Sequence, residues 1–231
     1  MKYQELHPWN VSLTEARLIQ EGLRHKIKQE DIDKEVRFIA GADISYARFS
    51  KEAYAGIVIM NWPQLEIVEK KGATGEMQFP YVPGLLTFRE GPTLLRAWDK
   101  IEQEPDLILF DGQGVAHPRG LGLAAHMGLI LNTPSIGCAK KRLTGRYEEP
   151  GEERGAYSNL YDQEDTIIGA AVRTKTKTKV LFISVGNLIS MPSAIEWVFK
   201  CTKGYRVTEP LRQAHMYVNQ LRKGDYGDSP R

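Results

Sequence analysis

The chain has 231 residues, with 42% hydrophobic and 26% charged residues, which are ordinary globular values and argue against disorder. The net charge of +2 is too small to diagnose nucleic-acid binding by itself, and two distant cysteines, Cys138 and Cys201, exclude a disulfide framework. No apolar run reaches the roughly 20 residues of a membrane span and the N-terminus lacks a signal-peptide core, so we expect a single cytoplasmic domain over 1–231 with a disordered tail at 224–231.

One helix and three strands are expected in the first third of the chain. Ser12 and Glu15 form a capping box that starts a helix over 13–28. Strands are then expected at 36–46, 53–62 and 65–71. Short connections between them predict an antiparallel meander. Asp43 falls inside the first strand, where a carboxylate is costly unless something pairs with it or it binds a metal.

The segment after the meander predicts an interrupted helix. Apolar residues recur at helical spacing up to Ile101, but Pro92 lies among them and would cost about 3 kcal/mol inside a regular helix. We therefore expect a kink or restart there, with Glu90 beside the break. Glu90 is either a functional carboxylate or an exposed one that favours the helix dipole.

The stretch from Asp106 to Gly128, DLILFDGQGVAHPRGLGLAAHMG, carries the strongest signal for a site. Four apolar residues, Leu107–Phe110, run without alternation, as in a strand buried on both faces. The strand ends on Asp111, and the glycines that follow predict a tight loop. Ligands of open α/β sheets bind at the carboxyl ends of strands, so Asp111 lies where a site is expected, unless it only caps the next element.

The rest of the chain completes an alternating α/β pattern. A helix is expected at 121–131, a parallel strand at 135–139, a polar surface excursion at 144–165, a strand hairpin from 166–174 and 179–185, and helices at 193–202 and 209–223. A meander followed by helix, parallel strand, helix and parallel strand is the order of the α/β ribonuclease H-like fold. We therefore expect a central mixed five-stranded sheet flanked by helices.

Basic residues cluster at two places. One cluster begins at Lys140, directly after the 135–139 strand, which places Lys140 at the same sheet edge as Asp111. In the other, four basic residues alternate with neutral ones, as on one face of a strand in a solvated hairpin. These four are Arg173, Lys175, Lys177 and Lys179.

The expected topology brings two carboxylates together for metal-assisted chemistry. Asp43 and Asp111 would lie on neighbouring strands and repel each other unless a cation sits between them. Oxygen ligands suit Mg²⁺ or Mn²⁺, and such ions can activate water for attack on a phosphodiester. We expect Glu90 to be a further ligand or to orient the water, His215 to carry a proton or ligate weakly, and Lys140 to neutralise the phosphate. A helical histidine such as His215 is nevertheless more often a solvated or core residue.

Two loop features each have a functional and a structural interpretation. His117 could contact the same phosphate or hydrogen-bond within its own glycine-rich loop. The segment Pro80, Tyr81, Val82 and Pro83 is stiff and could be a wedge that enters the base stack as a target base swings out. Alternatively, Tyr81 simply packs the loop onto the core.

Five segments of the chain resemble the endonuclease V family. They are GADISY around Asp43, FPYVPGLLTFREGP, FDGQGVAHPRGLGLAAHMG, SIGCAKKRL and EPLRQAHMY, and they follow the family's order over roughly positions 40 to 217. The resemblance implies a repair nuclease directed at deoxyinosine and dependent on Mg²⁺. It also implies a cut at the second phosphodiester bond on the 3′ side of inosine, leaving 3′-hydroxyl and 5′-phosphate ends.

The resemblance also assigns roles to residues. It implies that Asp43, Glu90 and Asp111 are the metal-site carboxylates, assisted by Lys140 and His215. Pro80 to Pro83 would be the wedge that separates the strands. Backbone groups at Gly112 and Gly122 would help to hold the flipped hypoxanthine, whose O6 acceptor and N1–H donor distinguish it from adenine.

The expected partner is inosine-containing DNA, single- or double-stranded, bound by a monomer without membrane association. Two other functions remain open at this point: cleavage of inosine-containing RNA, and a binding module that has kept the fold and lost the chemistry. A small-molecule hydrolase using Cys138 with His117 is a weaker alternative, because Cys138 lies in an apolar strand where an inert thiol is expected.

Overall fold

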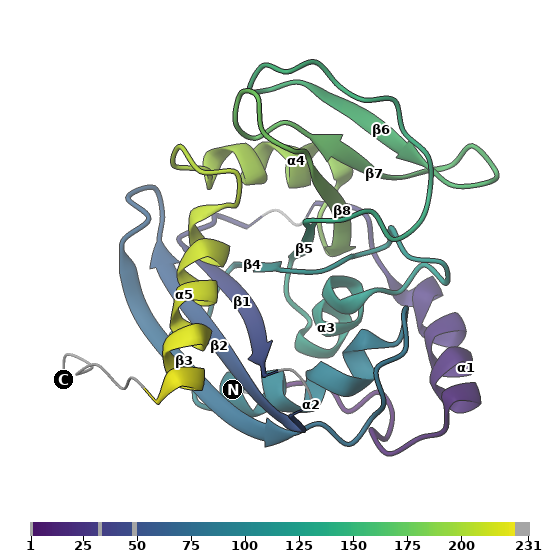
Figure 1. Ribbon diagram of the computed structural model, residues 1–231, viewed down its shortest axis with the longest axis vertical. Coiled ribbons are helices and arrows are strands. Elements are labelled where there is room, and N and C mark those ends of the chain that lie inside the picture. Colours follow the sequence, from purple (N-terminus) through teal and green to yellow (C-terminus); the bar gives the residue numbers. More distant parts are fainter. Residues whose placement is uncertain (1, 32–33, 48–49, 225–231) are drawn as a thin grey trace.

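The computed structural model describes residues 2–31, 34–47 and 50–224, and in this part of the chain eight strands form one sheet (Figure 1). The order across the sheet is β3-β2-β1-β4-β5-β8-β7-β6. The strands are β1 (Phe38–Tyr46), β2 (Glu52–Asn61), β3 (Ile67–Glu76), β4 (Leu107–Phe110), β5 (Ser135–Ala139), β6 (Tyr157–Tyr161), β7 (Ile167–Val172) and β8 (Leu181–Asn187). The expected tail at 224–231 lies, apart from Gly224, outside the described residues.

The central part of the sheet matches the expected topology. β1 pairs antiparallel with β2 and parallel with β4, and β4 pairs parallel with β5. The sheet does not stop at five strands, however, because β8 pairs antiparallel with β5 and β7 and β6 continue from it. The sequence predicted the β7–β8 hairpin, but an apolar hairpin does not say which sheet edge it joins.

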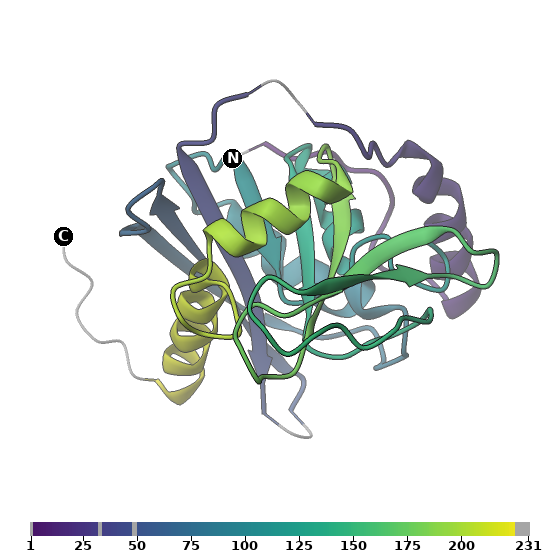
Figure 2. The same ribbon diagram turned by 90° about the horizontal axis from the view of Figure 1, so that it is seen from above.

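Helices cover both faces of the sheet (Figure 2). α2 (Leu86–Trp98) and α3 (Leu123–Leu131) pack against Ala40, Ile108 and Phe110 on one face. α4 (Met191–Lys200) and α5 (Glu209–Lys223) pack against Ile39, Leu107 and Leu109 on the other. Alternate residues of β1 and β4 therefore enter opposite cores, which explains the unbroken apolar run of β4. No helix in the described part of the chain is long and apolar enough to cross a membrane.

Three expectations about local structure were wrong. The first helix, α1, ends at Leu23 and a 3-10 turn follows over Arg24–Lys26, so it does not reach residue 28. α2 runs through Pro92 without a break, because a proline removes one helical hydrogen bond and burial of most of the helix against the sheet compensates. The polar excursion at 144–165 contains β6, which pairs with β7.

The second basic cluster also differs from the expectation. Its members do not share the face of a strand, because β7 ends at Val172 and β8 begins at Leu181. Arg173 is buried, whereas Lys175, Lys177 and Lys179 are exposed in the connecting turn.

α5 crosses β1 in direct backbone contact. A Cβ atom on Gly41 would lie 2.2 Å from the carbonyl carbon and oxygen of Pro210, so only glycine allows this approach. The contact brings the following turns of α5 over the second half of β1, which is where Asp43 lies.

Candidate active site

The register of β1 and β4 places two aspartates side by side. Ala42 is opposite Phe110 in the parallel pairing, and the Asp111 N–H donates to the Ala42 carbonyl oxygen at 3.4 Å. Asp43 and Asp111 are the next residue on each strand. The structure thus brings together the two carboxylates that the sequence singled out.

Asp43 is held by its own strand and by α5. Its Oδ1 accepts from the Ile44 N–H at 2.8 Å, and its Oδ2 lies 2.8 Å from His215 Nδ1. The side chain of Asp43 is only 10% exposed. Burial and then the charge of Asp111 raise the pKa of Asp43, whereas the His215 hydrogen bond lowers it. Asp43 therefore lies where a positive partner is favoured.

His215 has a second partner that sequence reasoning missed. Asn219, one turn later on α5, has its Nδ2 3.1 Å from His215 Nε2 and 2.8 Å from the His215 carbonyl oxygen. The Asn219 Oδ1 in turn accepts from Ser45 Oγ at 3.2 Å. The amide fixes the orientation of the imidazole from the side opposite Asp43. The only sequence signal is the spacing of four residues between His215 and Asn219.

Glu90 belongs to the same electrostatic group. It lies inside α2 with 7% of its surface exposed. Burial raises the pKa of Glu90 to about 8, the charges of Asp43 and Asp111 add to the rise, and Arg89 opposes it. The charges of Asp43 and Asp111 therefore disfavour the ionised form of Glu90, and a cation among these side chains would favour it.

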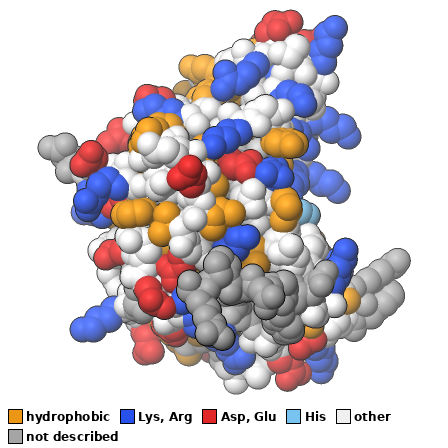
Figure 3. All heavy atoms as spheres, turned by 90° about the vertical axis from the view of Figure 1, so that its left-hand side faces the viewer, with side chains coloured by type: hydrophobic (Ala, Val, Ile, Leu, Met, Phe, Trp, Pro, Cys, Tyr) orange, Lys and Arg blue, Asp and Glu red, His pale blue; other side chains and the backbone are white. Residues whose placement is uncertain are grey.

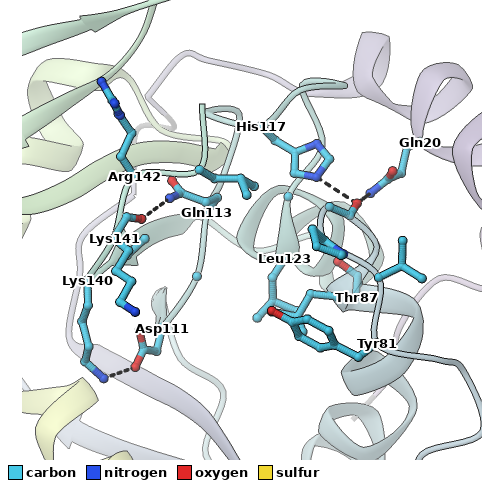
Figure 4. Close-up of a pocket in the computed structure, with 18 residues that line it drawn as sticks. Gln20, Tyr81, Thr87, Asp111, Gln113, His117, Leu123, Lys140, Lys141 and Arg142 are labelled. Carbon is cyan, nitrogen blue, oxygen red and sulfur yellow. Dashed lines mark hydrogen bonds and ion pairs between the residues drawn. The ribbon is translucent and has the colours of Figure 1, made fainter. Parts of the chain in front are cut away.

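Lys140 supplies a positive charge at the other side of Asp111. It follows β5, the parallel neighbour of β4, and its Nζ forms an ion pair with Asp111 Oδ2 (Figure 4). The sheet thus places Lys140 where the sequence predicted.

The oxygen atoms of Asp43, Glu90 and Asp111 are suitable ligands for a hard divalent cation. In this structure, however, these side chains do not surround a metal position. Among the described residues, no three His, Cys, Asp or Glu side chains are grouped closely enough to enclose a metal. Oxygens of Asp111 and Asp43 are instead bonded to Lys140 and His215. Carboxylate oxygens are the ligands that Mg²⁺ and Mn²⁺ prefer, and a cation would favour the ionised forms of Asp43 and Glu90, whose pKa values are raised. A divalent cation would therefore replace these two partners.

A cavity of about 450 Å³ opens beside Asp111 (Figure 4). This volume is within the range of small-ligand pockets. The segment Tyr81–Gly84 and the first residues of α2 line one side, and Gly112, Gly122 and the chain after Lys140 line the other.

The N-terminal ends of two helices meet at this cavity. Leu86 and Thr87 begin α2, and Gly122 and Leu123 lie at the start of α3. The first N–H groups of a helix have no partner inside it. Ala124 already donates to the Gln113 carbonyl oxygen at 2.9 Å and Phe88 to the Leu85 carbonyl oxygen at 3.2 Å, so the N–H groups of Thr87 and Leu123 are the candidates to meet acceptor atoms of a ligand. A Cβ atom on Gly122 would lie 2.4 Å from the Gln113 carbonyl oxygen, so this close turn requires glycine.

The N–H groups of the two pocket glycines are already used within the loop. Gly112 donates to the Phe110 carbonyl oxygen and Gly122 to the Gly114 carbonyl oxygen, both at 2.9 Å. Both glycines line the cavity, as expected. Their contribution is the close approach of the backbone.

His117 braces the loop. Its Nδ1 accepts from the Arg119 N–H at 3.1 Å, so its Nε2 donates to the Gly84 carbonyl oxygen at 2.9 Å. Burial, with the charge of Arg119, lowers the pKa of His117 to about 4. Both ring nitrogens are engaged and the ring is neutral, which favours the loop interpretation over a phosphate contact. Gln20 of α1, which carried no sequence signal, donates to the same carbonyl at 2.9 Å.

The proline-flanked segment stands at the rim of the cavity. Tyr81 is 65% exposed and lines the cavity. Its neighbour Val82 packs against the buried residues Phe79, Leu85 and Phe88. The segment is therefore anchored by one side chain while the tyrosine ring is presented outward.

The thiol of Cys138 is unsuited to nucleophilic chemistry. It is buried, and burial raises its pKa well above the ordinary value, so the reactive thiolate is suppressed. The small-molecule hydrolase alternative has no support from this geometry.

Comparison with known proteins gives one consistent result. A profile described as endonuclease V matches residues 21–216. Endonuclease V of Dehalococcoides mccartyi is 44% identical over 221 residues, covering 96% of this chain and 99% of the relative. The crystal structure of endonuclease V from Streptomyces avermitilis has a TM-score of 0.88 at 36% identity, covering 94% of this chain and 95% of that one.

One solved structure of a relative contains DNA. Endonuclease V of Ciona intestinalis, bound to a 24mer DNA that contains an inosine followed by a ribo-adenosine, has a TM-score of 0.81 at 26% identity. The match covers 92% of this chain and 98% of that one.

Proposed function

The chain belongs to the endonuclease V family, and from this premise we propose that it is a DNA-repair endonuclease that recognises deoxyinosine, the product of adenine deamination. Members of the family are nucleases, so the chain is an enzyme that hydrolyses phosphodiester bonds. The proposed cut falls at the second phosphodiester bond 3′ to the lesion and leaves 3′-hydroxyl and 5′-phosphate ends.

One observation carries the proposal: Asp43 and Asp111 lie side by side, and Asp111 lines a cavity that is large enough for a base. A base swung out of the stack can enter the cavity while its own strand passes the carboxylates. The exposure of the Tyr81 ring supports the proposal that Tyr81, with Pro80, Val82 and Pro83, forms a wedge that fills the vacated position in the stack.

Recognition of hypoxanthine would rest on main-chain groups. Its O6 and N7 are acceptors, and the proposed donors are the N–H groups of Thr87 and Leu123, which line the cavity at the starts of α2 and α3. Adenine has an amino group at the position of O6. An amino group cannot accept a hydrogen bond, so the N–H donor at this position would be left unpaired. Unpaired buried donors cost about 1–3 kcal/mol each, enough to favour hypoxanthine strongly.

In the proposed mechanism, Asp43, Asp111 and Glu90 hold Mg²⁺, for which Mn²⁺ can substitute. The ion supplies charge neutralisation at the phosphate and lowers the pKa of a water. Lys140 Nζ stabilises the extra negative charge of the pentavalent phosphate. When the ion takes the place of His215 at Asp43, Nδ1 of His215 would be released to exchange a proton with an oxygen of the reacting phosphodiester, while Asn219 keeps the ring oriented at Nε2.

The test is cleavage of end-labelled oligonucleotides with one inosine, made as DNA and as RNA, with Mg²⁺ or with EDTA. Cutting of the DNA one nucleotide beyond inosine, only with Mg²⁺, supports the proposal. Preferential cutting of RNA would contradict the choice of DNA. Binding of both without cutting would show the non-catalytic module instead.

A further inference from the structure

A second cavity, of about 600 Å³, lies on the other side of Lys140 and has no part in the proposed function. Residues 147–152 form one wall, and residues 173 and 177–180 form the other. Among the residues that the structure describes, Lys140 alone lines both this cavity and the cavity beside Asp111. The two hollows therefore lie on either side of the proposed catalytic lysine.

The walls of the second cavity are cross-linked by a buried arginine. Arg173 donates to the carbonyl oxygens of Gly151 at 3.1 Å and Pro150 at 3.0 Å, and to that of Thr178 in the opposite wall. Its Nη2 also pairs with Glu149 Oε1 at 2.7 Å. The cavity is thus built into the fold, and the negative charge of Glu149 in its wall is already balanced. Glu152 is the second carboxylate of that wall, so the two exposed lysines described next leave a net charge of one positive unit.

Unpaired positive charge remains at the mouth. Lys177 and Lys179 are exposed, and in the described part of the chain neither takes part in an ion pair. Figure 3 shows Lys and Arg side chains projecting one after another along the right-hand edge of its upper half. Inside the cavity, Tyr147 meets Phe182 edge to face at 5.2 Å. Binding sites for single-stranded DNA combine cationic side chains, which contact the phosphates, with aromatic side chains, on which bases stack.

The lysines of the second cavity are fixed relative to the proposed catalytic centre. Arg206 donates to the carbonyl oxygens of Lys140 at 3.1 Å, Lys179 at 2.7 Å and Val180 at 2.6 Å. One guanidinium therefore joins the backbone that carries Lys140 to the backbone that carries Lys179.

We propose that this second cavity binds the DNA strand on the 3′ side of the cut. The inference rests on the proposed function, in which the base occupies the first cavity and the cut bond lies 3′ of it beside Asp111 and Lys140. A strand that continues in the same direction passes Lys140 and meets Lys177 and Lys179, which bind its phosphates. The cavity would then hold the 5′-phosphate end of the product.

The test compares single-stranded DNA substrates with one inosine and either a short 3′ arm or a short 5′ arm. Binding is measured in EDTA, so that cleavage does not contribute. The variant is the double substitution Lys177→Glu with Lys179→Glu. The control, Lys2→Glu with Lys70→Glu, makes the same change in net charge at exposed lysines outside both cavities. Thermal unfolding checks that all proteins are folded.

The wild type and the control should bind about tenfold more tightly when the 3′ arm is lengthened, and the variant should lose this gain. For binding to the substrate with the long 3′ arm, the slope of log K against log salt concentration should be smaller in magnitude by about 1.4 in the variant. This is the change expected when two contacts to single-strand phosphates are lost. The change in binding affinity when the 5′ arm is lengthened should be the same in the wild type, the control and the variant.

Two results overturn the inference. Either the variant keeps the full gain from the 3′ arm, or it loses the gain from the 5′ arm instead. If the wild type cuts inosine-containing DNA in Mg²⁺ while either result is found, only this inference fails. If it cuts no inosine-containing DNA at all, the proposed function fails first.

Discussion

Acid should destabilise this protein through its buried histidines, and the largest contribution is expected from His126 of α3. The side chain is 0% exposed and its Nε2 lies 2.7 Å from His7 Nε2. His7 Nδ1 is 2.9 Å from the Pro8 carbonyl oxygen, which can only accept. His7 therefore carries its hydrogen on Nδ1, and His126 donates from Nε2. This leaves His126 Nδ1 without a hydrogen and, buried, without a partner.

Protonation of His126 would place a charge in the core with no acceptor for the new N–H. Burial accordingly lowers the pKa of His126 to about 3, whereas a histidine in the unfolded chain titrates near 6.5. Between these values the unfolded chain binds a proton that the folded chain does not, so stability is complete above pH 6.5 and is lost as the pH falls towards 3. The loss is about 1.4 kcal/mol per pH unit, or about 2 kcal/mol at pH 5.

The assay is urea unfolding, followed by circular dichroism, at about pH 7.5 and about pH 5. The wild type should lose about 2 kcal/mol more between the two pH values than His126→Gln, which keeps a donor and does not titrate. His25→Gln, at an exposed histidine, should behave like the wild type. An equal loss of stability in the wild type and His126→Gln would refute the reasoning.

Three further variants test the proposed centre. Asp111→Ala should lower the rate of cleavage roughly 10³-fold while DNA binding in EDTA is kept or improved, because a negative charge near phosphate is removed; normal cutting would exclude Asp111. Tyr81→Ala should weaken binding to inosine in duplex DNA by about 1–3 kcal/mol, as measured by titration, and binding to single strands by less; equal losses would exclude the wedge. Asn219→Leu should reduce kcat about tenfold, because one hydrogen bond worth about 1 kcal/mol no longer orients His215, and should shift the pH profile of kcat; an unchanged profile would leave Asn219 with a structural role only.

The sequence predicted those parts of the fold that depend on the local order of apolar and polar residues. The bounds of β4 and β5 were correct to the residue, because strands buried on both faces read as unbroken apolar runs. The pairing of Asp43 with Asp111 followed from topology, because parallel neighbours end at the same sheet edge. The family assignment and the nuclease activity are likewise confirmed.

The parts that the sequence could not predict depend on tertiary contacts. β6 is polar and alternates poorly, and it exists because β7 offers a free edge. α2 continues through Pro92 because the sheet beneath it outweighs one lost hydrogen bond. The amide of Gln20 reaches Gly84 across 64 positions of sequence, a contact with no local signature.

The hydrogen bond from His215 to Asp43 joins two residues that are 172 positions apart. Because α5 follows all eight strands of the described sheet in the chain, it docks on β1 only after those strands have left the ribosome. A nascent or C-terminally truncated chain would have the carboxylates without the histidine. The order of synthesis would therefore keep the proposed nuclease centre incomplete until the fold that restricts its substrate is in place.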